Sequence, residues 1–76
     1  MALRAYMLIE VQLGMTEEVV EEVGRLEGVK SVDRVIGPCD VIATIEVADF
    51  DALSTLIKQI PHEIGILKVA TLVKVR

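Results

Sequence analysis

The segment Gly37, Pro38, Cys39 and Asp40 holds the groups in this sequence that are best suited to binding a small polar molecule. Glycine and proline favour a tight turn, whose free backbone N–H groups can receive an anion. The carboxylate of Asp40 can hold an ammonium group through charge-assisted hydrogen bonds. Together these groups suit a zwitterion, although composition alone favours the plainer interpretation of an ordinary hairpin turn.

The single cysteine, Cys39, and the single histidine, His62, could in principle form a nucleophile and its base. No third orienting group or oxyanion site accompanies them, and His62 follows Pro61 in a loop, so we expect a solvated histidine. A metal site built from Cys39, Asp40, His62 and Glu63 would match no compact ligand spacing. We therefore expect no enzyme, no catalytic residue, no metal and no cofactor.

The overall composition excludes several classes of protein. The net charge of −4 and the presence of only two aromatic residues, Tyr6 and Phe50, argue against direct binding of nucleic acid. No apolar run approaches the ~20 residues that a membrane helix needs. A lone cysteine fits a reducing compartment. We expect a cytoplasmic protein that contacts neither membrane nor nucleic acid.

The first half of the chain predicts a strand, a helix and a second strand. Apolar and polar residues alternate over 3–13, which is typical of a strand. Helical spacing predicts a helix over 16–27, with Thr16 as the N-cap, acidic residues in the first turn and Gly28 at the C-terminal stop. Residues 29–36 then predict a strand with the charged character of a sheet edge.

The second half repeats this order. Alternation over 41–47 predicts a third strand, and a second helix follows, capped by Asp49 or Asp51 and ended by Pro61. A final strand is predicted over 64–75. The order β-α-β-β-α-β and right-handed crossovers predict one α+β domain, ferredoxin-like, with both helices on one face of a four-stranded antiparallel sheet. The expected spatial strand order is 4-1-3-2.

Two helices on one face leave the other face of such a sheet open. Its centre is predicted to carry Tyr6, Leu8, Ile42, Thr44, Ala70 and Leu72. Around this centre lie Arg4, Glu10, Glu46, Lys68 and Lys74. An apolar centre with a charged rim is typical of a protein interface, and a chain of 76 residues that is 53% hydrophobic carries more apolar material than its small core can hide. We expect sheet-to-sheet dimerisation, although scattered apolar residues also occur on solvated sheets.

Four short segments carry a resemblance to a known family: 5–9 (AYMLI), 26–29 (LEGV), 37–40 (GPCD) and 69–71 (VAT). Their order along the predicted elements resembles the C-terminal effector-binding domain of the Lrp/AsnC family of transcriptional regulators, also called the RAM domain. The resemblance covers essentially the whole chain, 1–76. Family members carry a helix-turn-helix before this domain, whereas here the first strand begins almost at the first residue, so we expect no DNA-binding domain.

The resemblance implies that an amino-acid effector binds between dimers, near the turn that joins the second and third strands. It also implies homodimers that assemble further, up to octameric rings. Carried over to this sequence, Gly37 and Asp40 are the leading ligand contacts, Pro38 and Cys39 line the turn, and Thr71 is a further candidate. The family commonly has an aromatic residue or histidine where Cys39 stands, so the resemblance leaves the ligand preference open.

Two functions are compatible with these features. The leading hypothesis is an amino-acid-binding, oligomerising regulatory module, in which ligand shifts the assembly equilibrium through its higher affinity for the assembled state. The alternative is a ligand-independent interaction module that hetero-oligomerises with full-length Lrp/AsnC regulators through the same sheet face.

Overall fold

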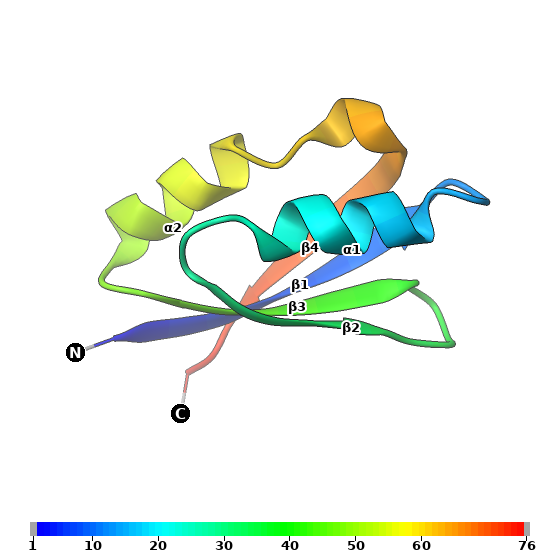
Figure 1. Ribbon diagram of the computed structural model, residues 1–76. Coiled ribbons are helices and arrows are strands. Elements are labelled where there is room, and N and C mark those ends of the chain that lie inside the picture. The colour runs from blue at the N-terminus through cyan, green and yellow to red at the C-terminus, as the bar shows by residue number, and fades with distance from the viewer. Residues whose placement is uncertain (1, 76) are drawn as a thin grey trace.

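A computed structural model describes residues 2–75 and shows both helices packed on one face of a four-stranded sheet (Figure 1). The elements are β1 (Leu3–Val11), α1 (Thr16–Gly24), β2 (Val29–Arg34), β3 (Val41–Val47), α2 (Phe50–Lys58), a short 3₁₀ helix η1 (His62–Ile64) and β4 (Ile66–Val73). The sheet is antiparallel, in the order β2-β3-β1-β4. The predicted ferredoxin-like fold and strand order are confirmed.

The core lies between the sheet and the two helices. Successive residues of a strand point to opposite faces, so every second residue of β1 and β3 enters the core. The buried hydrophobic residues are Ala5, Met7, Ile9, Val11, Val19, Val23, Val41, Ala43, Ile45, Leu53, Leu56, Ile60 and Ile66. No polar or charged residue of the described chain is buried with them. The side-chain contacts within the core are therefore apolar.

Strands β1 and β2 are both shorter than predicted, because backbone hydrogen bonds turn the chain earlier. After Val11, the amide of Met15 donates to the carbonyl of Gln12 at 3.0 Å, which closes a turn before α1. At the end of β2, the amide of Val35 donates to the carbonyl of Asp40 at 2.9 Å. This bond encloses the connection between β2 and β3.

A β-bulge in β4 corrects the predicted assignment of residues to its two faces. Lys68 pairs with Glu10 and Ile66 pairs with Val11, so Leu67 is an extra residue with no partner. Ile66 consequently joins the core at 7% exposure, whereas Leu67 is 67% exposed. Strict alternation over 64–75 predicts the reverse for both side chains.

Helix α1 differs from its prediction at both ends. Its N-cap is Met15, which makes no side-chain capping bond, so Thr16 is the first helical residue and not the cap. The helix ends at Gly24 and not at residue 27, because the next two amides bond to carbonyls three residues back, as in a tighter 3₁₀ turn.

No helix within residues 2–75 has the length and apolar character needed to cross a membrane.

Helix α2 is capped by Asp49 and not by Asp51. A carboxylate oxygen of Asp49 accepts a hydrogen bond from the amide of Ala52 at 2.8 Å, which satisfies one of the free N–H groups at the helix start. After α2 the chain forms η1, so β4 begins later than the predicted residue 64.

We expect Gly28→Ala to destabilise the domain more than Gly14→Ala. Gly28 has φ +101°, and a Cβ atom there would lie 2.8 Å from Cγ1 of Val47, so alanine adds a clash to backbone strain. Gly14 has φ +87° but no atom within 4 Å of the corresponding position. Urea unfolding at one fixed protein concentration should show a loss of about 2–3 kcal/mol for Gly28→Ala and about 1 kcal/mol for Gly14→Ala. Equal losses would contradict the role of the close approach to Val47.

Candidate functional site

The connection between β2 and β3 contains the four residues that the sequence singles out as a ligand turn, Gly37, Pro38, Cys39 and Asp40, called here the 37–40 turn. It lies at the end of the sheet opposite both chain ends (Figure 1). Cys39 is half-buried and the other three residues are exposed. The amide of Asp40 donates to the carbonyl of Ile9 at 2.9 Å. The turn therefore lies beside the end of β1, and its four residues are brought together as predicted.

The carboxylate of Asp40 is already engaged on one side. Its Oδ2 accepts a hydrogen bond from the backbone amide of Val11 at 2.8 Å. The pairing of β1 with β3 stops at Ile9, which lies opposite Val41, so the side chain of Asp40 continues the contact beyond the paired strands. Its Oδ1 has no hydrogen-bond donor among residues 2–75. Sequence reasoning missed this contact, because no local pattern links residues 29 positions apart.

Three backbone amides of this connection are unpaired. Within the described part of the chain, the N–H groups of Ile36, Gly37 and Cys39 find no protein acceptor. Together with Oδ1 of Asp40, they place donors for an anion and an acceptor for a cation in one short segment. The turn can thus receive both ends of a zwitterion.

Thr71, the remaining predicted ligand contact, lies in β4 and not in the 37–40 turn. It pairs with Met7 in β4, which places it on the helix-facing side of the sheet, where it is half-buried. Strand β1 separates β4 from β3 and its turn. Within one chain, Thr71 is therefore not part of the group formed by the 37–40 turn.

The register of the sheet arranges the predicted open face as two rows across three strands. One row is Ile42, Leu8 and Ala70, and the other is Thr44, Tyr6 and Leu72. These six residues, called here the open face, are half-buried or exposed, and Leu72 retains 48% of its accessible surface. Directly paired residues of antiparallel strands share one face of the sheet, so these six side chains lie together on it.

Charged residues border the open face as predicted. Arg4 lies opposite Glu46, and its Nε is 3.3 Å from a carboxylate oxygen of that residue. Glu10 lies opposite Lys68 on the other side of β1. An exposed ion pair such as that of Arg4 and Glu46 contributes little to stability, typically less than about 1 kcal/mol. The effect of these four charged residues is to give the apolar rows a polar border.

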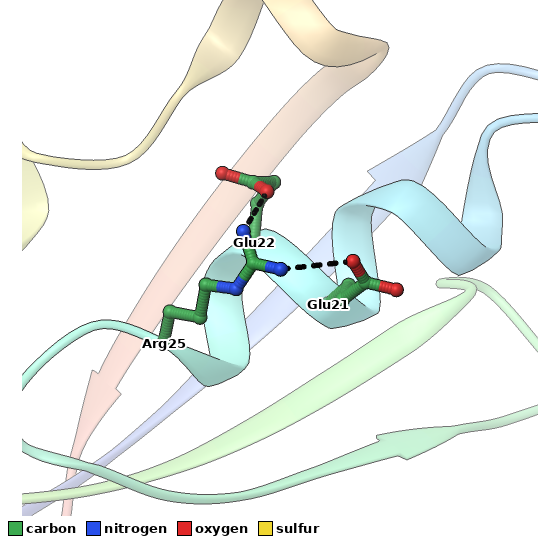
Figure 2. Close-up of polar contacts among 3 residues, drawn as sticks. All are labelled: Glu21, Glu22 and Arg25. Carbon is green, nitrogen blue, oxygen red and sulfur yellow. Dashed lines mark hydrogen bonds and ion pairs between the residues drawn. The ribbon is translucent and has the colours of Figure 1, made fainter.

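The acidic side of α1 is partly neutralised by one arginine. Arg25 contacts Glu21 at 3.0 Å and Glu22 at 2.8 Å (Figure 2). Glu21 stands four residues before Arg25 and Glu22 three residues before it, and both spacings bring side chains together on one helix face. Arg25 and Glu21 are largely exposed and Glu22 is partly exposed, as expected for a solvated helix surface. Among residues 2–75, no cluster of three or more His, Cys, Asp or Glu side chains could hold a metal ion.

A groove of about 570 Å³ lies at the other end of β3, away from the 37–40 turn. It is lined by Glu27, Gly28, Lys30, Glu46, Val47, Ala48, Ala52, Thr55, Leu56 and Gln59. None of the predicted ligand contacts belongs to it. Its lining comes from several segments that are distant in the sequence, so no motif could have indicated it. This groove and the group of free donors and acceptors are thus at different places.

Comparison with known proteins finds a matching family and solved structures with the same fold. The model of the family described as Lrp/AsnC ligand binding domain matches residues 4–76. A comparison with functionally curated proteins finds no match. Two solved structures cover almost the whole chain and are themselves almost wholly covered. TTHA0845 from Thermus thermophilus has a TM-score of 0.89 at 25% identity, over 97% of this chain and 94% of that one. The hypothetical protein PHS023 from Pyrococcus horikoshii has a TM-score of 0.86 at 23% identity, over 100% and 92%.

A longer protein shares the same fold in one part. The transcriptional regulator NMB0573 from Neisseria meningitidis, solved as a complex with L-Met, has a TM-score of 0.84 at 16% identity. The match covers 97% of this chain but 50% of the regulator. Since the family match extends over nearly all of the sequence, we conclude that the chain belongs to the Lrp/AsnC ligand-binding domain family, a family of regulatory modules.

Proposed function

We propose that this domain binds an L-amino acid at the 37–40 turn and acts as an oligomerising regulatory module. The observation that carries the proposal is the group of unpaired amides of Ile36, Gly37 and Cys39 beside the free Oδ1 of Asp40. An α-amino acid presents a carboxylate and an ammonium group one carbon apart, so such a group can receive both. Membership of a ligand-binding family and the L-Met complex of NMB0573 support this assignment.

The open face is the proposed dimer surface. A 76-residue domain buries only about 60% of the surface exposed by its unfolded chain, so it gains much from covering a further apolar area. The two rows present that area on β1, β3 and β4, and the border of Arg4, Glu46 and Lys68 contains both signs of charge. A two-fold axis can bring opposite charges of two copies together. A second copy of the chain therefore fits this surface.

The turn and the open face would act in sequence. The turn is exposed at one end of the sheet, so a ligand bound there is open to solvent until another dimer packs against it. A ligand that contacts both dimers binds the assembled state more tightly and shifts the equilibrium towards it. We propose this role in the cytoplasm, without DNA binding or catalysis by the domain itself. The same face could join a full-length regulator that contains the shared domain.

Calorimetric titration with the common L-amino acids should identify at least one ligand. In a two-dimensional NMR titration of backbone amides, that ligand should shift Ile36, Gly37 and Cys39 most, since their N–H groups would donate to its carboxylate. Lys30→Ala, which removes the ammonium group of the distant groove, should leave the affinity unchanged. An absence of binding heat, or shifts confined to the groove, would contradict a ligand site at the turn.

Leu8→Glu should dissociate the dimer. A buried leucine contributes about 1.5–3 kcal/mol, and a two-fold interface contains it twice, so the dissociation constant should rise at least about a hundredfold. Phe50→Glu is the matched control, because Phe50 is 64% exposed but lies at the start of α2, away from the open face. Sedimentation velocity at low micromolar concentration measures both. A monomeric wild type, or an assembled Leu8→Glu variant, would refute this surface.

A further inference from the structure

Three hydrogen bonds meet at Asp40: two tie the 37–40 turn to β1 and one closes the connection between β2 and β3. Its amide donates to the carbonyl of Ile9, and its carbonyl accepts from the amide of Val35, both at 2.9 Å. Its Oδ2 accepts from the amide of Val11 at 2.8 Å. The two backbone bonds can form with any residue except proline at position 40. Only the third depends on the side chain.

Packing does little to hold the turn between these anchors. Ile36 is fully exposed and so is the backbone around Gly37, where an added Cβ atom would meet nothing within 4 Å. Pro38 is exposed as well. With few apolar contacts to restrain it, the conformation of such a segment depends on its hydrogen bonds. Loss of the carboxylate would also leave the amide of Val11 without its acceptor, which has a large cost for a buried residue.

We propose that Asp40 is a positioning residue as well as a ligand contact. Its Oδ2 holds the 37–40 turn on Val11, so that the amides of Ile36, Gly37 and Cys39 are aligned for the ligand carboxylate. Its Oδ1 is left for the ligand ammonium. The inference rests on the proposed amino-acid site. It assigns one oxygen of the carboxylate to holding the turn and the other to binding the ligand.

Two substitutions at position 40 separate positioning from charge. Asp40→Asn keeps an oxygen that can accept from Val11 but removes the negative charge, whereas Asp40→Ala removes both. If Asp40 positions the turn, affinity for the amino acid found in the titration should fall in Asp40→Asn. It should fall further in Asp40→Ala, by on the order of tenfold relative to Asp40→Asn. Hydrogen exchange of the Val11 amide should be fast only in Asp40→Ala.

Asp49→Ala is the matched control. It removes a carboxylate oxygen that accepts from a backbone amide at the same distance, 2.8 Å, but at the start of α2. It should lower thermal stability and speed exchange at Ala52 while leaving ligand affinity unchanged. A comparable loss of affinity in this control would mean that stability alone governs binding, which would overturn the positioning role.

The remaining outcomes separate this inference from the proposed function. If the wild-type domain binds amino acid but Asp40→Asn and Asp40→Ala weaken it equally, Asp40 acts through charge alone and the positioning role is wrong. Protection of the Val11 amide that persists in Asp40→Ala would lead to the same conclusion. If the wild-type domain binds no common L-amino acid, the proposed function itself fails, and the positioning of a ligand fails with it.

Discussion

Hydrogen bonding of β1 on both of its edges is the interaction on which the rest of this structure depends. Antiparallel pairing with β3 and β4 fixes the face to which each residue points. One set of alternate β1 residues, Ala5, Met7, Ile9 and Val11, becomes the centre of the core under the helices. The other set places Tyr6 and Leu8 in the middle of the two rows of the open face. A slip of one residue would exchange these two sets.

The same strand also supports the proposed ligand site. At its last pair with β3 it offers the carbonyl of Ile9, and two residues further on it offers the amide of Val11; Asp40 bonds to both. Core packing, the candidate dimer surface and the candidate ligand turn therefore share one strand. In the proposed function this arrangement would link ligand binding to assembly, since a ligand contact at the end of β1 and a dimer contact across its open side would act on one strand.

Much of the fold could be predicted, because apolar and polar residues alternate along a strand wherever its pairing is regular. The bounds of β3 and the six residues of the open face follow from this alternation, whereas the strand order follows from the order of the elements and right-handed crossovers. The bulge at Leu67 could not be predicted, since one inserted residue reverses the faces without leaving a local signal. The bond between Asp40 and Val11 joins distant segments, so the sequence indicated the carboxylate but not its partner. Thr71 was carried over by resemblance, and its place in the sheet separates it from the turn.

A crystal structure grown with a mixture of the common L-amino acids tests the central claim most directly, because it reports assembly and ligand together. The account predicts two copies packed through their open faces, with Leu8 and Ile42 covered, and an amino acid beside the 37–40 turn. The amino acid's carboxylate should lie on the free amides and its ammonium on Oδ1 of Asp40. Open faces left in solvent, together with amino acid bound elsewhere or not at all, would contradict it.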